Sequence, residues 1–225
     1  MIRFLLTAAL LLTAPALAAE RPYVTAAQVD LMQLLPPPPA ETGGELAQVL
    51  DAQATRTPER TAQAVADVQE TLTAIYGSVL GDRFAPEAAP LATRLFARLG
   101  ETEAAVVGPA KDKFARPRPF MIDPDVHPAV PPSRSGSYPS GHATRGTLEG
   151  IVLAAMLPEL RGPIFARMDD YARSRVIGGA HFPSDVAAGM RAGTAIAAVL
   201  FDDPGFRAEF EPARRELRAA IGLGE

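Results

Sequence analysis

The stretch SYPSGHATRGTLEGIVLAAMLP, residues 137–158, passes from a proline-rich loop into an apolar segment within a few residues. Such a change is typical of a helix that begins near Ser140 or Gly141 and ends before Pro158. The first backbone N–H groups of a helix have no acceptor within the helix, and the helix dipole is positive at that end. The start of this segment, with His142 in its first turn, is therefore a candidate anion-binding site.

Helical patterns recur elsewhere in the chain, and no segment shows the alternation typical of a half-buried strand. Thr57 with Pro58, and Asp203 with Pro204, indicate helix starts, since Thr and Asp are favoured N-caps and Pro a favoured first residue. Apolar residues recur at three- and four-residue steps in three segments: Val65, Val68, Leu72, Ile75 and Val79; Leu91, Leu95 and Leu99; Phe206, Phe210, Ala213, Leu217 and Ile221. We therefore predict an all-α fold with one helical domain, residues 43–225.

The first 42 residues differ from the rest of the chain. Residues 1–18 combine a basic residue near the start, an apolar run and a small-residue cleavage site, the pattern of a secretory signal peptide. An uncleaved membrane anchor is the alternative, but the apolar run is short for a membrane span. Residues 19–42, with four prolines at 36–39, predict an extended arm. We expect export to a periplasm and no membrane attachment after cleavage.

The composition excludes several kinds of site. The 225 residues contain no cysteine, which excludes disulfides, thiolate nucleophiles and cysteine-bound metal clusters. A formal net charge of −4 and the absence of Trp argue against a nucleic-acid-binding protein. The functional groups are therefore expected among histidines, carboxylates and individual cations.

The proline-rich segment 116–139 is long for a loop in a compact domain, and such loops are usually functional. Lys111 and Arg118 form a cationic group at its start. We expect Arg116 and Arg134 to extend a positive field or to be solvated, His127 to have a structural or rim role, and Asp112 and Lys113 to lie on the surface.

A third group of residues lies between 174 and 185. His181 follows two glycines and precedes Pro183, so a helix start is expected there. Asp185, four residues later, lies on the same helix face and would fix the tautomer of the imidazole. Arg175 continues the stripe of Ile164, Met168 and Tyr171 on a helix from Pro163. An arginine on such a stripe must be paired or bind an anion.

Each of these patterns alone has an ordinary structural explanation, but three occur together: Lys111-x6-Arg118-Pro119, Pro139-Ser140-Gly141-His142 and Ser174-Arg175-x5-His181-x3-Asp185. Together they resemble the signature of the type 2 phosphatidic acid phosphatase (PAP2) superfamily, which includes bacterial class A non-specific acid phosphatases and vanadium haloperoxidases. Leu34–Pro39 and Ser174–His181 are also similar to the acid phosphatases. Gly179 replaces a frequent Cys of that family, and Phe182 a frequent Trp, which would alter the pocket rim.

The resemblance implies an acid phosphatase that hydrolyses small phosphate monoesters of broad range, with no metal or other cofactor. The phosphate would be bound by Lys111, Arg118, Arg175, the Ser140 hydroxyl and the backbone at Gly141.

The resemblance also implies roles for the histidines. His181, oriented by Asp185, would attack phosphorus and form a phosphohistidine, while His142 would protonate the leaving group and then activate water. This scheme needs one neutral and one protonated histidine, which predicts an acid optimum if the surroundings separate the two pKa values.

Other functions fit parts of the pattern. A vanadium-dependent haloperoxidase uses the same constellation but is generally a longer chain, and a phosphotransferase could use the same site. Membrane-lipid phosphatases carry several transmembrane helices, and a phosphate-binding protein would need no catalytic histidines. We expect no nucleic-acid partner, and association into a homo-oligomer stays open.

Overall fold

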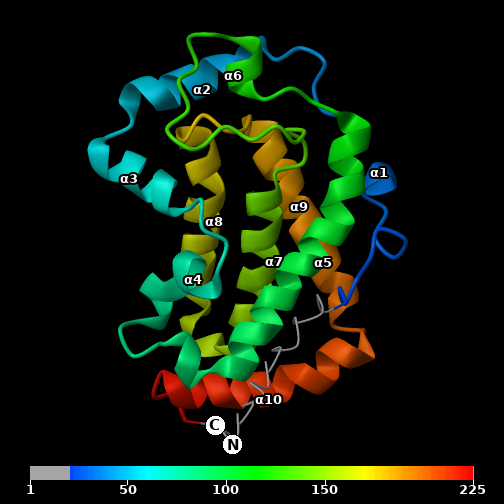
Figure 1. Ribbon diagram of the computed structural model, residues 1–225, viewed down its shortest axis with the longest axis vertical. Coiled ribbons are helices and arrows are strands. Elements are labelled where there is room, and N and C mark those ends of the chain that lie inside the picture. The colour runs from blue at the N-terminus through cyan, green and yellow to red at the C-terminus, as the bar shows by residue number, and fades with distance from the viewer. Residues whose placement is uncertain (1–20, 225) are drawn as a thin grey trace, which may run out of the picture.

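Four long helices run side by side along the long axis of the computed structural model, which describes residues 21–224 (Figure 1). They are α5 (Pro90–Phe114), α7 (Gly141–Met156), α8 (Arg161–Ile177) and α9 (Pro183–Leu200). Helix α7 is central and packs against the other three, while α10 (Pro204–Ala220) packs across the lower end against α5. Residues 21–224 contain no strand, which confirms the predicted all-α fold.

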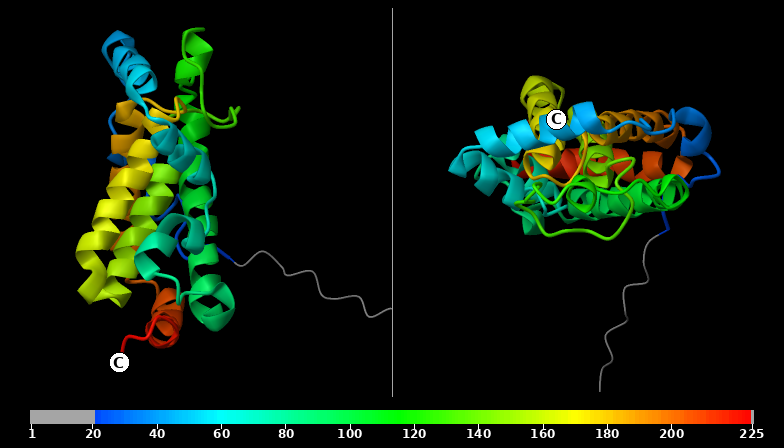
Figure 2. Two further views of the ribbon diagram at one scale, coloured as in Figure 1. Left: turned by 90° about the vertical axis from the view of Figure 1, so that its left-hand side faces the viewer. Right: turned by 90° about the horizontal axis from the view of Figure 1, so that it is seen from above.

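Shorter helices complete the fold, and two of them cover its upper end (Figure 1). They are α1 (Leu31–Leu34), α2 (Gly43–Thr55), α3 (Pro58–Ala66), α4 (Leu72–Leu80), α6 (Pro119–Ile122) and the 3-10 turns η1 (Pro86–Ala88) and η2 (Pro158–Leu160). Helices α2 and α6 lie above the ends of the long helices, as both side views show (Figures 1 and 2). The C-terminal ends of α5 and α8 and the N-terminal ends of α7 and α9 therefore meet beneath them.

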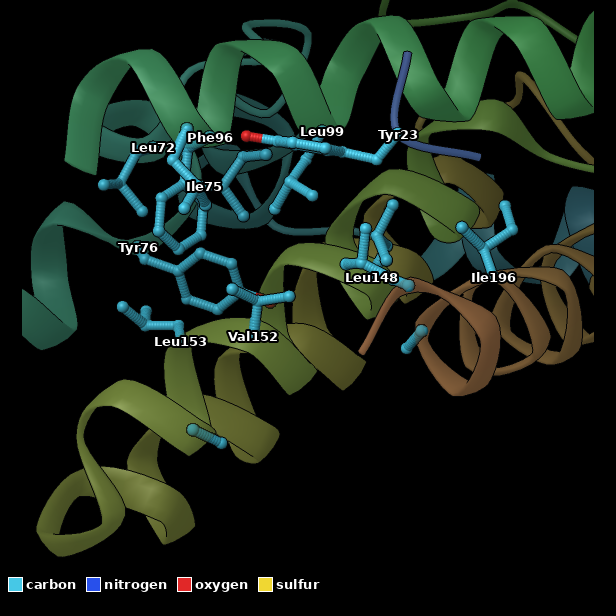
Figure 3. Close-up of a cluster of buried hydrophobic side chains, with 14 of the residues drawn as sticks. Tyr23, Leu72, Ile75, Tyr76, Phe96, Leu99, Leu148, Val152, Leu153 and Ile196 are labelled. Atoms are coloured by element: carbon cyan, nitrogen blue, oxygen red, sulfur yellow. The ribbon is translucent and has the colours of Figure 1, made fainter. Parts of the chain in front are cut away.

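The core lies where α4, α5, α7 and α9 face one another (Figure 3). Ile75 and Tyr76 of α4 pack with Leu99 of α5 and Leu148 of α7, and all four side chains are buried. Burial of each such side chain contributes roughly 1.5–3 kcal/mol. The Tyr76 hydroxyl donates to the Gly146 carbonyl oxygen at 2.6 Å, which joins α4 to α7 by a buried hydrogen bond.

The predicted helix starts are confirmed at both places. The Thr57 side chain accepts the Arg60 N–H at 3.2 Å, and the Asp203 carboxylate accepts the Phe206 N–H at 2.7 Å. A proline follows each cap as the first helical residue. Local capping chemistry thus sets both ends as the sequence indicates.

The single stripe predicted from Val65 to Val79 is wrong. The chain leaves the helical path after Ala66 and forms a second helix from Leu72, so the segment is two helices, α3 and α4. Val65 is 46% exposed. The physical reason is Asp67, which is buried and paired with Arg167 of α8 at 2.5 Å. This long-range ion pair holds the connection between α3 and α4 against the bundle.

The N-terminal arm packs against the core. Tyr23 and Val24 are buried, and the Tyr23 N–H donates to the Thr102 hydroxyl of α5 at 3.0 Å. The arm is not extended throughout, because one helical turn, α1, interrupts it. The predicted signal peptide, residues 1–18, lies outside the described residues.

Within residues 21–224, no helix alone has both the length and the apolar character needed to cross a membrane. Helices α9 and α10 meet both criteria only when taken together, and they are bent by 96° at their junction.

Candidate active site

A cavity of about 320 Å³ lies at the upper end of the bundle, where the four long helices end. Six of the residues singled out from the sequence line it: Lys111, Arg118, Gly141, His142, Arg175 and His181. They come from α5, the long loop, α7, α8 and the α8–α9 connection. The structure therefore brings the three sequence patterns together around one cavity.

The N-terminus of α7 forms one wall of the cavity. Gly141 and His142 line it, and helix geometry leaves their N–H groups without an acceptor in the helix. The Ser140 side chain is buried, is absent from the cavity lining, and accepts the Ala143 N–H at 3.3 Å as the helix cap. This bond uses an acceptor position of the hydroxyl and leaves its O–H as a donor, so the predicted contact with phosphate stays a prediction.

Three cations face the cavity and are held by carbonyl oxygens. Lys111 Nζ donates to Gly136 O at 2.8 Å, and Arg175 Nη2 donates to Ala64 O at 2.6 Å. Arg118 donates to the Ser135 and Ala180 carbonyls, both at 3.0 Å. Within residues 21–224 none of the three forms an ion pair. Neutral acceptors fix their positions, so their charge stays available to an anion.

Burial lowers the pKa values of these cations. The pKa of Lys111 falls to about 8, first because of burial and then because of the nearby Arg118 charge. The pKa values of Arg118 and Arg175 are also lowered, mainly by burial. Cations clustered out of water are costly, and a bound anion offsets that cost.

His181 lies between Arg118 and Asp185. Arg118 Nη1 is 3.1 Å from His181 Nε2, and since a guanidinium only donates, Nε2 carries the lone pair. The proton is therefore on Nδ1, which lies 3.4 Å from Asp185 Oδ2. This is the tautomer expected from the sequence. It leaves Nε2 with a free lone pair.

Asp185 is buried, and its charge is stabilised from several directions. Its Oδ2 accepts the Ser137 hydroxyl at 2.5 Å and the Phe182 N–H at 2.8 Å, and its Oδ1 accepts Arg116 Nη1 at 2.6 Å. Burial alone would raise its pKa, but the hydrogen bond and charge of His181, with Ser137 and Arg116, hold the pKa below its usual value. The carboxylate thus stays ionised and orients His181.

Arg116 is neither solvated nor part of the field over the cavity, so that expectation is wrong. It is buried, pairs with Glu45 of α2 at 2.8 Å as well as with Asp185, and its guanidinium lies 4.2 Å from the centre of the Phe182 ring. Phe182 is fully buried and does not form the pocket rim, contrary to expectation. Sequence gives little sign of this cluster, because Glu45 lies far from Arg116 along the chain.

His142 is held by the connection between α3 and α4. Its Nε2 lies 3.3 Å from the Val68 carbonyl oxygen, and its Nδ1 lies 3.3 Å from Glu70 Oε1. Its ring stacks on Tyr171, with the ring centres 6.0 Å apart. Because a carbonyl oxygen only accepts, Nε2 carries a proton and Nδ1 is the nitrogen that gains and loses one.

The two histidine pKa values are lowered together rather than separated. Burial is the largest cause for each, and neighbouring positive groups add to it; the pKa falls to about 4 for His181 and about 3 for His142. The expected separation fails because both imidazoles are buried, and Lys111 lowers both pKa values further. Any proton on His142 during a reaction must therefore accompany a bound anion.

Two carboxyl groups in the cavity lining were not expected from the sequence. Glu70 precedes α4, and Glu103 of α5 is 9% exposed. The pKa of Glu103 is raised to about 8, first by burial and then by the Glu70 charge. The spacing of Glu103, Val107 and Lys111 along one helix face could have revealed Glu103, whereas no local pattern indicates Glu70.

The remaining predicted residues lie away from the cavity lining. The backbone of His127 is held by hydrogen bonds: its N–H donates to the Gln53 side chain of α2, and its carbonyl accepts from Arg56, which follows α2. Arg134 is exposed, as are Asp112 and Lys113, the two residues that follow Lys111. No group of three or more metal-binding side chains occurs in the described part of the chain.

Comparison with known proteins gives consistent results. The PAP2 superfamily model matches residues 95–208. The chain is similar to an acid phosphatase of Zymomonas mobilis, 37% identical over 58% of this chain and 51% of that protein, so the match spans about half of that relative. It is also similar to non-specific acid phosphatases of Providencia stuartii, 31% identical over 84% of this chain and 81% of that protein, and Salmonella typhimurium, 34% identical over 68% and 63%.

Among solved structures, the fold is similar to a transmembrane PAP2 type phosphatidylglycerolphosphate phosphatase from Bacillus subtilis. The TM-score is 0.56 and the identity 18%, over 72% of this chain and 84% of that one. At this identity the likeness shows a shared fold.

Proposed function

The chain belongs to the PAP2 superfamily, and on this basis we propose that it is an acid phosphatase that hydrolyses phosphate monoesters through a phosphohistidine. The observation that carries the proposal is the cavity, where Lys111, Arg118 and Arg175 have no carboxylate partner among the described residues and face His142 and His181. Such a site neutralises the charge that spreads over phosphate oxygens in the transition state.

The first step forms a bond between His181 Nε2 and phosphorus. The three cations and the N–H groups of Gly141 and His142 hold the phosphate oxygens, and the P–O bond to the leaving group breaks. His142 Nδ1 delivers a proton to the leaving oxygen, so an alcohol departs. Asp185 stabilises the charge that develops on the His181 ring.

The second step returns the enzyme to its starting state. His142 Nδ1, now without its proton, accepts one from a water molecule whose oxygen attacks phosphorus. The P–N bond breaks, phosphate leaves, and His181 Nε2 regains its lone pair. In this scheme Ser140 acts by capping α7 and so positioning Gly141 and His142.

We also propose a broad substrate range and export to the periplasm. The names of the Providencia and Salmonella relatives support the first, and the composition of residues 1–18 supports the second. N-terminal sequencing of protein recovered from a periplasmic fraction tests export. A chain that still begins at Met1 would contradict cleavage.

The activity is tested with p-nitrophenyl phosphate in the presence of a chelator, with orthovanadate as inhibitor. We expect turnover that the chelator leaves intact and vanadate blocks. Two arginine variants form a matched pair: Arg118→Ala removes a cavity cation, and Arg134→Ala removes an exposed one. The first should weaken phosphate binding by about tenfold or more, and the second should leave it unchanged. Halide oxidation with vanadate and peroxide, without phosphatase activity, would overturn the proposal.

A further inference from the structure

The proposed mechanism leaves two carboxyl groups of the cavity without a role. Glu70 and Glu103 both line it. Glu103 is 9% exposed, and its carboxyl group has no hydrogen bond or ion pair with any residue from 21 to 224. A buried polar group that faces a cavity without a partner is costly, so it is a candidate for contact with a ligand.

Glu70 marks the side of the cavity from which the leaving group departs. Its Oε1 is 3.3 Å from His142 Nδ1, the atom that protonates the leaving oxygen in the proposed reaction. The Glu70 side chain is 36% exposed, so it lies towards the mouth. Whatever is attached to that oxygen must therefore pass beside Glu70. Val107 and Ala104, in the same lining, carry no charge that could neutralise it.

The leaving-group side of the cavity differs in charge from the phosphate side. In the proposed reaction Lys111, Arg118 and Arg175 hold the phosphate oxygens, whereas the leaving oxygen receives its proton from His142 Nδ1, which lies 3.3 Å from Glu70 Oε1. Arg145, the other cation near Glu70, is already paired with Glu149 at 2.8 Å. A second anionic group on the substrate would have no partner there, whereas a cation would have Glu70.

Glu103 adds a carboxyl group that keeps its proton. Burial and the nearby Glu70 charge raise its pKa to about 8, against the opposing effect of Lys111 and Arg145. Near neutral pH the pair therefore carries one negative charge, on Glu70, beside one carboxylic acid that can donate a hydrogen bond.

We propose that Glu70, with Glu103 beside it, forms an acidic wall that selects phosphate monoesters with a neutral or cationic leaving group over those with a second anionic group. This inference rests on the proposed phosphatase function and names its substrate class. A unit charge about 6 Å away at a partly exposed site changes kcat/KM by about tenfold.

The test compares three substrates of similar size: phosphocholine, its uncharged analogue 3,3-dimethylbutyl phosphate, and 3-phosphonooxypropionate. For each substrate, kcat/KM of the wild type at pH 7 is divided by kcat/KM of Glu70→Gln. We expect this quotient to fall from phosphocholine to the uncharged ester to the carboxylate, by about tenfold per unit charge. Dividing by the variant removes differences in the intrinsic reactivity of the esters. It also removes any effect of Glu70 on His142 that is common to all three.

Two further variants sharpen the result. Glu101→Gln, on the exposed face of α5, is the matched control and should keep the wild-type ratios. Glu103→Gln should also keep them at pH 6, because Glu103 is already neutral. Equal ratios in wild type and Glu70→Gln, or loss of selection in Glu103→Gln instead, would overturn the inference. Failure of the wild type to hydrolyse any of the esters would count against the phosphatase function itself.

Discussion

The charged side chains of the site are stabilised in two different ways. Asp185 accepts hydrogen bonds from Arg116, Ser137 and the Phe182 backbone, so its charge is neutralised within the protein. The cavity cations Lys111, Arg118 and Arg175 donate to backbone carbonyls and keep their charge. The first arrangement fixes His181, and the second leaves positive charge available to an anion.

A substitution of Arg116 tests whether its ion pair with Asp185 stabilises the fold. Arg116→Met keeps much of the side-chain volume but leaves Asp185 buried without its cation, so we expect a loss of about 3 kcal/mol in the free energy of unfolding. Urea denaturation measures it. Lys113→Met, on the exposed face of α5, is the control and should change stability by less than about 0.5 kcal/mol. A loss below about 1 kcal/mol in Arg116→Met would show that Asp185 does not depend on this partner.

His181 tests the nucleophile. His181→Ala should reduce turnover by more than about a thousandfold, because the remaining imidazole, His142, is needed as the acid and base of the proposed reaction. Its circular dichroism should match the wild type. Acid quenching of the wild type with labelled substrate should trap a phosphorylated protein, and the variant should give none. His127→Ala should behave as wild type in both assays; trapped label in His181→Ala would exclude His181 as the nucleophile.

Helices α7 and α9 pack closely enough that a glycine is required between them. A Cβ on Gly189 would lie 2.9 Å from Ala143 Cβ and even closer to the Ser140 carbonyl oxygen. The Ser140 N–H donates to the Asp185 carbonyl at 2.9 Å, so the same crossing joins the anion-binding turn to the start of α9. The spacing of these helices therefore sets the geometry of the site.

Gly189→Ala should separate the two helices, because backbone rather than a flexible side chain opposes the new methyl group. We expect a loss of about 2 kcal/mol in unfolding free energy, together with lower kcat/KM. Gly44→Ala in α2, where an added Cβ meets nothing within 4 Å, should instead raise stability by about 0.5 kcal/mol. Thermal and urea unfolding measure both. Equal effects of the two substitutions would contradict the close packing.

The sequence predicts some of the helices well and others poorly. Helices α7 and α10 are predicted well, because caps such as Ser140 and Asp203 and the following stripes are local signals. The break between α3 and α4 is not predicted, because it depends on Asp67 pairing with Arg167, 100 residues away. That break carries Glu70 to His142 and so alters the site.

In the site, too, local patterns are predictable from the sequence and long-range contacts are not. Motif spacing predicts that the cationic and imidazole groups converge, since each lies at the end of a helix or loop with its own local pattern. The roles of Arg116 and Glu45 are not predicted, because the two residues pair with each other across a long stretch of sequence. Ser140 is predicted to bind phosphate, and the structure adds a second, local role, because its hydroxyl oxygen caps α7.

For the whole molecule, buried ionisable groups determine how stability depends on pH. The pKa values of Glu103 and Glu149 are raised to about 8 and about 7, mainly by burial, so the folded protein holds protons that the unfolded chain loses above about 4.5. The lowered pKa values of His142 and His181 act in the opposite direction near pH 6.5, so the net fall in unfolding free energy from pH 6 to pH 8 should be about 1–2 kcal/mol. Calorimetry at several pH values measures this, and Glu103→Gln should have a shallower slope. Stability that rises over this range would contradict the argument.

Activity should show its own pH dependence, with an acid optimum. Below about pH 4 His181 becomes protonated and loses its lone pair, so kcat/KM falls. Above about pH 6 a phosphate monoester loses the proton that His142, with its lowered pKa, needs for the leaving group. Above about pH 8 Lys111 loses its charge and kcat/KM falls further. Lys111→Arg should abolish this last step, because arginine stays protonated. A profile measured with p-nitrophenyl phosphate that is flat from about pH 5 to 9, or an alkaline step unchanged in Lys111→Arg, would contradict these assignments.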